Sequence, residues 1–470
     1  MRGGLSTRPA AWAVALLAIY TAIVIPSLGQ SLLESHAYRQ TQTAYTAVLF
    51  AERDIDVLRP PLPVLGAPGI VPLEFPLFQA LGAIPIRLGV APDLAMRLVG
   101  VLTFLASAIL LYLLARRLLP ERAALFALGA FLFNSHALLY GRASLIEYLA
   151  VGFGLGFVYF VIRWLDGGRW TNWLLALIGG AGVMLVKITT APIFLIPALF
   201  WVSRSGTRAY RMPSVWLLLA IAGAVGLGWS QYADAVRAGN PATEFLAARN
   251  SFEWFFGTLG QRLDPSAWRV PLVALLTLSG FGLIFWGFLS ARFAALHPQR
   301  AYLLAMLLVV AITPLLLFNL YAIHDYYYAV LAPFIAIAIG MGSEHLLTAP
   351  RTRGTRRLMV GLAGAWVATF IGSAGSWTLI YGTPAEEARV FETAAYIREH
   401  SDADDWVVIE GFGWNSTFLY YAQRQGFADP TGDNLLEPGD IDIDAILDDP
   451  IYGPFFTCDS QGVCVVSETR

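Results

Sequence analysis

Long apolar runs alternate with short polar segments along most of the chain. A helix that crosses a bilayer needs about 20 predominantly apolar residues, and about eleven runs approach that length. These runs are Ala10–Leu28, Leu94–Leu114, Ala123–Leu139, Leu145–Trp164, Trp173–Val186, Ala191–Val202, Val215–Trp229, Val270–Leu289, Ala301–Leu320, Tyr327–Leu347 and Leu358–Ile380. The pattern predicts an all-α polytopic membrane protein. The first run exceeds the roughly 7–15-residue core of a signal peptide, which favours a retained helix over a cleaved signal.

Basic residues mark every second connection between these runs. With the N-terminus inside the cell, the connections predicted on the inner side are rich in arginine and contain only three acidic residues, Glu121, Asp166 and Glu344. Cytoplasmic loops carry such an excess of basic residues. We therefore expect an inner (plasma) membrane protein with a cytoplasmic N-terminus and an extracytoplasmic C-terminus. This orientation depends on counting the short fifth and sixth runs separately.

Two long polar segments lie on the predicted outer side, within a transmembrane catalytic domain of residues 1–383. They are residues 31–93 and residues 232–269. The second is rich in Trp and Phe, which suits a helix that lies on the membrane surface. The remaining residues, 384–470, are expected to form a small extracytoplasmic α/β domain.

This tail alternates helical and strand patterns. We expect a helix near Ala385–His400, a strand at Trp406–Glu410, a helix near Asn415–Gln425 and short strands ending at Gly462–Ser467. The only two cysteines, Cys458 and Cys464, also lie here. They either pair in an oxidising compartment or remain two free thiols.

Composition agrees with a membrane protein and excludes several other classes. Only 14% of residues are charged, against roughly 25% in soluble domains. A net charge of −2 gives no indication of a nucleic-acid partner. The chain has no phosphate-binding glycine loop, HExxH, CxxC or GxSxG motif, so nucleotide, zincin and hydrolase-elbow chemistry are not indicated. No spacing of acids is diagnostic for a metal, which leaves a need for a divalent metal open and no cofactor certain.

Reactive side chains concentrate at the start of the first outer segment. Glu34, His36, Tyr38, Arg39 and Gln40 fall within seven residues, directly after the first apolar run. A carboxylate at this position can act as a general base if its neighbours orient it. The alternative is a solvated loop acid.

Four further clusters lie at the outer ends of apolar runs. The clusters are Glu74 between two prolines, Arg142 with Glu147, the single lysine Lys187, and His324-Asp325 followed by three tyrosines. Each has a plainer alternative, which is, in the same order, a surface acid, a helix-end salt bridge between Arg142 and Glu147, a lysine that extends to the interface, and an aromatic belt.

The predicted topology puts all five clusters on one face. Acids and cations on one side of an apolar bundle suit transfer from a lipid phosphate, because a base can deprotonate an acceptor while cations stabilise charge on the phosphate. A lipid or sugar transporter (flippase) is the alternative function, and it requires polar residues near the bilayer midplane. A non-catalytic scaffold of the envelope is a third interpretation.

The layout and several motifs resemble the GT-C fold glycosyltransferases that use polyprenyl-phosphate sugars, a family that includes protein O-mannosyltransferases and bacterial aminoarabinose transferases. The stretch from His36 to Ala44 is similar to a His-x-Trp-Arg-Gln-x-x-Thr-Ala pattern of a bacterial branch. Further similar stretches are Glu74–Leu77, Tyr140–Arg142 with Glu147, Lys187, His324–Tyr327 and Tyr420–Arg424. The chain departs from the family pattern at Glu34-Ser35 (often Asp-Glu), at Tyr38 (Trp) and at Glu147 (often Asp).

The resemblance implies inverting transfer of a sugar from a polyprenyl-phosphate carrier to a lipid, glycan or protein acceptor on the extracytoplasmic face. It also implies an acidic base in the first outer loop. The candidate catalytic acids are Glu34, Glu147 and Glu74, and Glu34 is the expected base, with Glu147 next. The candidate substrate-binding residues are His36, Tyr38, Arg39, Gln40, Arg142, Lys187, His324 and Tyr327. Of these, His36, Arg39 and Gln40 are expected to position the base and the acceptor, and Arg142, Lys187 and His324 to bind the lipid phosphate.

Overall fold

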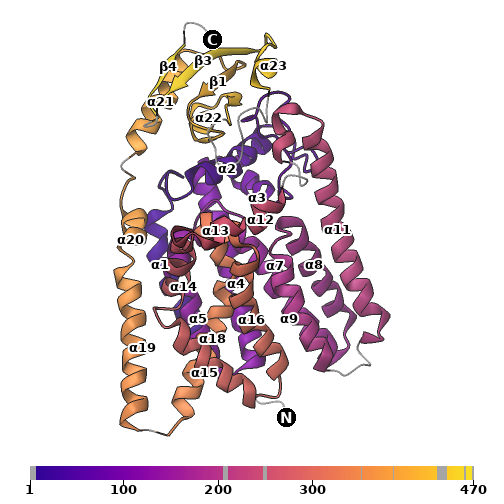
Figure 1. The fold of residues 1–470 in the computed structure, drawn as a ribbon, viewed down its shortest axis with the longest axis vertical. Coiled ribbons are helices and arrows are strands. Elements are labelled where there is room, and N and C mark those ends of the chain that lie inside the picture. Colours follow the sequence, from indigo (N-terminus) through magenta and orange to yellow (C-terminus); the bar gives the residue numbers. More distant parts are fainter. Residues whose placement is uncertain are drawn as a thin grey trace.

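A bundle of apolar helices supports a small four-stranded unit at one end of its long axis (Figure 1). The computed structural model describes residues 7–204, 210–246, 251–350, 352–384, 386–430, 442–459 and 462–467. Four helices in these ranges are long and apolar enough to cross a membrane. They are α1 (Thr7–Val24) with the 3-10 turn η1 (Ile25–Ser27), α4 (Pro92–Leu118), α7 (Glu147–Gly167) and α11 (Pro213–Ala238).

Two further helix pairs reach that length only when taken together. The segment ending in α14 (Arg269–Leu278) meets α15 (Leu283–Leu296) at a bend of 59°, and α19 (Arg353–Gly372) meets α20 (Ala374–Tyr381) at 45°. Further apolar helices are shorter than a full membrane span. They are α8 (Trp170–Val186), α9 (Ala191–Arg204), α16 (Arg300–Leu316) and α18 (Ala332–Thr348).

Every apolar run predicted from the sequence contains helix, but some runs are interrupted. The third run divides into α5 (Glu121–Leu132) and α6 (Ser135–Tyr140), because Asn134 Oδ1 accepts a hydrogen bond from Ala137 N (2.9 Å) and caps a new helix. The ninth run divides at Leu317 into α16 and α17 (Phe318–Ile323). Among the described residues, four helices are long and apolar enough by themselves to cross a membrane, or six with the bent pairs, and the other predicted runs form shorter or interrupted helices.

The central helices pack closely enough to need glycine at their contact. A Cβ atom at Gly179 of α8 would lie 2.6 Å from Phe157 N and 2.9 Å from Phe153 O of α7. Small residues at such contacts let helix backbones approach in membranes, where dispersion rather than water exclusion drives association.

The three acids of the predicted inner connections all form ion pairs with arginines of the same side. The pairs are Arg116–Glu121 (3.3 Å), Arg117–Asp166 (3.1 Å) and Arg122–Glu344 (2.7 Å). The last pair is bidentate, because Arg122 Nε also donates to Glu344 (2.8 Å), and it joins α5 to α18. Acid placement on this side therefore reflects helix–helix contacts.

The first outer segment folds into α2 (Ala37–Glu52), α3 (Leu77–Arg87) and a loop between them. Three neighbours hold the loop, which we call loop 60–76. Ala428 N donates to Val64 O (2.9 Å), Phe75 N donates to Leu185 O (3.2 Å) at the end of α8, and an arginine of α11 donates to the loop backbone. The loop is therefore fixed between the tail and the helical bundle.

The second outer segment contains several short helices instead of one long amphipathic helix. They are η2 (Pro241–Leu246), α12 (Ser251–Phe256), α13 (Leu259–Leu263) and η4 (Pro265–Trp268). Phe252, Leu259 and Leu263 are each more than 70% exposed, so apolar side chains do point away from the bundle. Residues 247–250 of the predicted segment lie outside the described part of the chain.

The tail forms a mixed sheet with strand order β2-β1-β3-β4. β1 (Trp406–Glu410) pairs in parallel with β2 (Gln425–Ala428) and β3 (Tyr452–Cys458), whereas β4 (Cys464–Val466) is antiparallel to β3. The helices are α21 (Glu387–Glu399), α22 (Thr417–Ala422) and α23 (Ile443–Leu447). The strand predicted at 406–410 is confirmed, and α21 and α22 lie inside the predicted helical segments. The predicted start at Ala385 lies outside the described residues.

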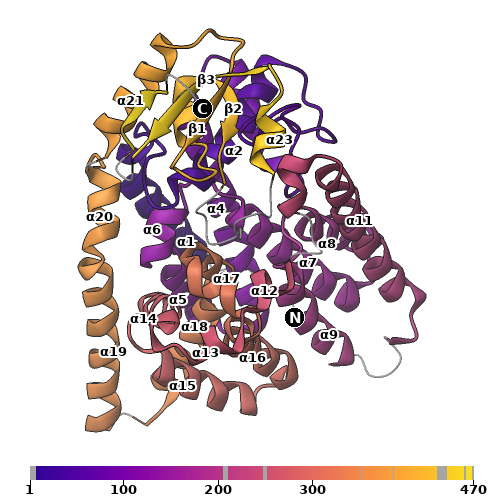
Figure 2. The ribbon, with the colours of Figure 1, turned by 45° about the horizontal axis from the view of Figure 1, so that its top comes forward.

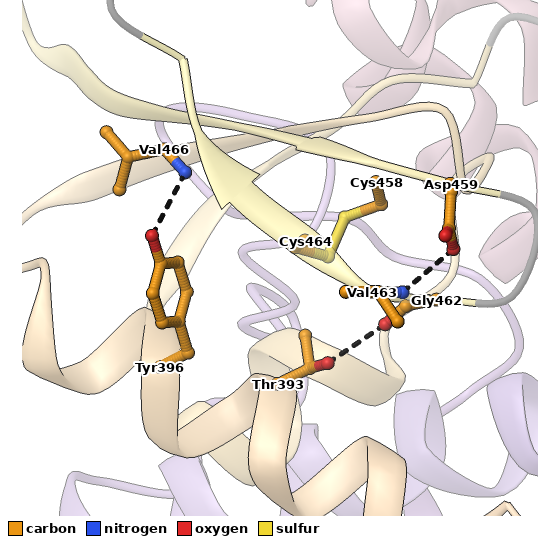
Figure 3. The surroundings of a disulfide bond; sticks show 8 residues. All are labelled: Thr393, Tyr396, Cys458, Asp459, Gly462, Val463, Cys464 and Val466. Atoms are coloured by element: carbon orange, nitrogen blue, oxygen red, sulfur yellow. Dashed lines mark hydrogen bonds between the residues drawn. A yellow bond between two sulfur atoms is a disulfide. The ribbon is translucent and has the colours of Figure 1, made fainter.

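A disulfide between Cys458 and Cys464 joins β3 to β4 (Figure 3). Helix α21 supports the same hairpin. Thr393 Oγ1 donates to Gly462 O (2.9 Å), and the Tyr396 hydroxyl accepts from Val466 N (3.4 Å). The sequence left pairing and free thiols as alternatives, and the structure contains the pair.

The tail sits directly on the first outer segment, with its sheet above α2 (Figure 2). Ser416 Oγ donates to Tyr38 O (2.8 Å) at the start of α2. The hydroxyls of Tyr420 and Tyr421 both donate to the carboxylate of Asp93, at 2.6 and 3.0 Å. The sequence stretch that contains these tyrosines is therefore a docking element for the membrane part of the protein.

Candidate active site

Glu34 lies in a closed ion-pair cluster. Its side chain is 2% exposed, and its two oxygens accept from Arg97 (2.9 Å) and Arg142 (2.5 Å), both of whose side chains are fully buried. Gln40 Nε2 lies 3.4 Å from the same carboxylate, and its Oε1 accepts from Ser144 N (3.0 Å). The carboxylate thus joins α4 and the connection between α6 and α7 to the first outer loop.

Arg97 is a member of this cluster that sequence reasoning missed. It lies within the apolar run of α4 and donates to the backbone of the residues just before Glu34 as well as to Glu34 itself. A charge inside an apolar run is costly unless it is paired, and that cost was the signal that could have identified it.

A second ion pair joins α2 to loop 60–76. Arg39 Nη2 lies 2.5 Å from Glu74 Oε2, and the Glu74 side chain is 27% exposed. Burial raises the pKa of Glu74, but Arg39 and Lys187 lower it by more, so the pKa lies below its ordinary value. Glu74 is therefore an ionised and partly accessible carboxylate.

Lys187 directly follows α8 and pairs with Glu147, the first residue of α7. Both side chains are at most 5% exposed. The Lys187 ammonium also lies 3.9 Å from the centroid of the Tyr327 ring, a cation–π contact. Among the described residues, Glu147 Oε2 has no hydrogen-bond partner. The helix-end salt bridge between Arg142 and Glu147, the plainer alternative, is not formed, because Arg142 pairs with Glu34 and Glu147 pairs with Lys187.

Asp325 connects the start of α2 to η5 (Asp325–Val330). His36 Nε2 lies 2.8 Å from Asp325 Oδ1, and the Tyr140 hydroxyl donates to the same oxygen (2.6 Å). Burial raises the pKa of Asp325, but the hydrogen bond from His36, the nearby His136 and the hydrogen bond from Tyr140 lower it by more, to about 2. His36 has a left-handed backbone (φ 57°) at the α2 N-terminus, which directs the ring toward this carboxylate.

His324 lies among aromatic rings. Its ring is nearly parallel to those of Tyr326 and Tyr327, with centroids 5.1 and 5.9 Å apart, and Trp254 of α12 approaches its edge. Burial first, and then the charges of His36 and Lys187, lower the pKa of His324 to about 3. The imidazole is therefore neutral near pH 7, and can donate one hydrogen bond but does not supply the positive charge expected for a phosphate ligand.

The predicted residues thus form two groups. Glu34, Gln40 and Arg142 lie in the closed cluster with Arg97. The other predicted residues surround Lys187 and the η5 tyrosines: His36, Tyr38, Arg39, Glu74, Glu147, His324 and Tyr327.

A cleft opens beside the Arg39–Glu74 pair. It is small and open to solvent, and it lies between α2, α3 and loop 60–76. Arg39 and Glu74 line it, whereas Glu34, Glu147, Lys187 and His324 do not. This cleft therefore does not contain all the predicted residues. Within the described ranges, no three His, Cys, Asp or Glu side chains converge in a way that could hold a metal ion.

Comparison with known proteins places this geometry in a family context. Residues 71–229 match the family model of dolichyl-phosphate-mannose-protein mannosyltransferase. That segment contains Glu74, Arg142, Glu147 and Lys187. A search of curated proteins found no matching sequence.

Solved structures with the same architecture extend the match to most of the chain. ArnT from Cupriavidus metallidurans bound to undecaprenyl phosphate is similar with a TM-score of 0.59 and 15% identity, over 92% of this chain and 89% of that one. Its apo form gives 0.58 and 14%, over 90% and 87%. The oligosaccharyltransferase AglB from Archaeoglobus fulgidus, in complex with an inhibitory peptide and a dolichol-phosphate, gives 0.59 and 12%, over 90% of this chain and 64% of that one.

These similarities establish the fold class. The chain has the GT-C fold, built on several apolar helices with a small C-terminal sheet. The fold expected from the sequence resemblance is thereby confirmed.

Proposed function

We propose that the protein is an inverting membrane glycosyltransferase that moves a hexose or pentose from a polyprenyl-phosphate carrier to an acceptor. The observation that carries this proposal is the position of Glu74. It is an ionised, partly exposed acid next to two cations, in the family-matched segment of a GT-C fold.

The bilayer orientation is part of the proposal. The N-terminus is cytoplasmic, and the tail and active site face the extracytoplasmic side of the inner membrane. The arginine-rich connections of the sequence support this orientation. The Cys458–Cys464 disulfide supports it too, because disulfides persist in oxidising compartments.

In the transfer step, the acceptor hydroxyl oxygen bonds to the anomeric carbon while the bond from that carbon to the phosphate oxygen breaks. The electron pair of the broken bond goes to the phosphate, and the hydroxyl proton goes to the Glu74 carboxylate. Lys187 and Arg39 stabilise the charge that develops on the leaving lipid phosphate. Inversion follows because acceptor and phosphate lie on opposite sides of the reacting carbon.

Glu34 has a positioning role in this proposal instead of the base role expected from the sequence. Two guanidinium groups occupy its oxygens, and 2% exposure leaves no access for an acceptor. Glu147, bound by Lys187, sets the position of the ammonium.

The proposal is tested with purified protein in detergent and a panel of radiolabelled polyprenyl-phosphate sugars. We expect release of label from at least one lipid donor, and inhibition by undecaprenyl phosphate as a product analogue. A well-folded protein that releases label from none of the donors would contradict the proposal and favour the transporter.

A further inference from the structure

One side chain of α11, Trp229, contacts the residues on both sides of Glu74. Its Nε1 atom donates a hydrogen bond to Leu73 O (3.2 Å). Its ring meets the Phe75 ring nearly at a right angle (83°), with the centroids 5.1 Å apart. Edge-to-face contact is a preferred arrangement of aromatic pairs. Trp229 therefore holds loop 60–76 immediately before and immediately after the proposed base.

Trp229 is itself fixed where α11 packs on the end of α8. The residue is 8% exposed. One turn earlier in α11, Gly226 lies so close to α8 that a Cβ atom there would be 2.5 Å from Met184 Cβ. Leu185, the next residue of α8, accepts the hydrogen bond from Phe75 N (3.2 Å). The position of this helix pair is thus passed on to the loop.

The same helix pair positions the cation that the transfer step uses. Lys187 directly follows α8, whereas Glu74 is carried by the loop, and Arg39 of α2 holds only its carboxylate (2.5 Å). A general base has to stand within hydrogen-bond reach of the proton that it removes. A misplacement of about 1 Å can cost roughly 10²-fold in rate. The backbone on either side of Glu74 therefore has to be fixed relative to the end of α8.

We infer that Trp229 is a positioning residue for the transfer reaction, which sets the place of the Glu74 carboxylate relative to Lys187. The inference rests on the proposed function of Glu74 as the base. Loop 60–76 keeps other attachments without the indole hydrogen bond. Arg237 Nη1 of α11 donates to Pro72 O (2.6 Å), and the tail holds the far end of the loop. Loss of the indole contact is thus expected to displace Glu74 without unfolding the protein.

Trp229→Phe removes the indole N–H group and keeps an aromatic ring for Phe75. The matched control is Trp173→Phe. Trp173 Nε1 also donates to a backbone carbonyl, Ser214 O (2.9 Å), and also joins α8 to α11. Ser214 lies in the first turn of α11, about 22 Å along the helix from Trp229. The two substitutions thus remove the same kind of hydrogen bond near Glu74 and far from it.

The assay is single-turnover release of label from the polyprenyl-phosphate sugar that wild type cleaves fastest in the donor panel. We expect Trp229→Phe to lower the rate about 10-fold at saturating donor, with an unchanged half-saturating donor concentration and an unchanged Tm. Trp173→Phe should release label at the wild-type rate. A wild-type rate in Trp229→Phe would overturn the inference.

A double-mutant cycle shows whether the effect of Trp229 passes through Glu74. In protein that already carries Glu74→Gln, Trp229→Phe should lower the rate by less than about 2-fold, because the group that it positions is gone. The same 10-fold loss in both backgrounds would overturn the inference and leave Trp229 with a merely structural role. A Glu74→Gln rate near that of wild type would overturn the base, and the positioning role with it.

Modification of Glu74 by a water-soluble carbodiimide, followed by mass spectrometry, needs no turnover and separates the two proposals. We expect Trp229→Phe to speed this modification roughly 3- to 10-fold, the effect of one lost hydrogen bond on opening of the loop, and Trp173→Phe to leave it unchanged. Faster modification without release of label from any donor would retain the positioning of Glu74 by Trp229 and overturn the glycosyltransferase function. Equal modification rates in all three proteins would overturn the inference.

Phe75→Leu is the second variant, for the case that Trp229→Phe does not fold. It removes the ring contact from the loop side and leaves the helix pair unchanged. We expect slower release of label and faster modification of Glu74, as in Trp229→Phe. Wild-type values of both rates in Phe75→Leu would contradict the role of the ring contact.

Discussion

Replacement of Glu34 by Gln is expected to destabilise the whole membrane part of the protein. The substitution leaves Arg97 and Arg142 buried without a counter-charge. Both side chains are fully buried, so neither guanidinium can turn to water. Removing one member of a buried ion pair costs about 3–5 kcal/mol, and here two cations lose their partner.

Glu344→Gln is the matched control for this change. Glu344 is also buried (6% exposed), but its partner Arg122 is 56% exposed and remains hydrated when the acid is removed. Exposed pairs contribute about 0–1 kcal/mol. Both substitutions thus replace a similarly buried glutamate by glutamine. They differ in whether the arginine left without its partner is buried or exposed to water.

The assay is thermal unfolding of the purified variants in one detergent. We expect Glu34→Gln to lower Tm by on the order of 5 °C or more, and Glu344→Gln to lower it by a small fraction of that. Equal shifts would refute the structural role of Glu34. A stable Glu34→Gln variant without transfer activity would instead return Glu34 to the role of base.

Three other outcomes follow from the site and the tail. Lys187→Met should raise the half-saturating donor concentration about 10-fold, because it removes a buried positive charge that attracts the phosphate without contacting it, and Lys187→Arg should retain part of that attraction; unchanged donor kinetics would contradict that role. Transfer should persist down to pH 4.5 and fall only below it, because the pKa of Glu74 is lowered from 4.5 and the carboxylate is the active form; a pH–rate profile with a midpoint above 4.5 would contradict this. Cys464→Ser should destabilise the tail by about 2 kcal/mol. Under oxidising conditions a protease should therefore cleave the tail of the variant faster than that of wild type, and reduction of wild type should abolish the difference.

Local patterns in the sequence predicted the helices and the first strand of the tail because both depend on near neighbours. The apolar runs located the helices, and alternating residues at 406–410 located β1. Breaks in the runs depend on single residues. Asn134 starts a new helix by capping it, and Phe281 takes a left-handed backbone (φ 57°) between α14 and α15. Hydrophobicity averaged over a run does not contain this information.

The sequence also indicated most residues of the candidate site but not the residues that contact them. Glu34 and Arg142 are 108 positions apart, and His36 and Asp325 are 289 apart, so only the packed helices bring them together. The interpretation of Glu34 as the base rested on its position in the first outer loop. We propose Glu74 instead, because Glu34 is enclosed by two arginines whereas Glu74 lines a cleft.

The central claim is that Glu74 is the base of a lipid-linked sugar transferase. The most direct measurement is single-turnover transfer of labelled sugar by folded Glu74→Gln protein, compared with wild type at saturating donor and acceptor. A loss of roughly 10²–10⁴-fold in rate, the usual contribution of a general base, with unchanged Tm and donor binding, is predicted. A rate within a few-fold of wild type would contradict the claim.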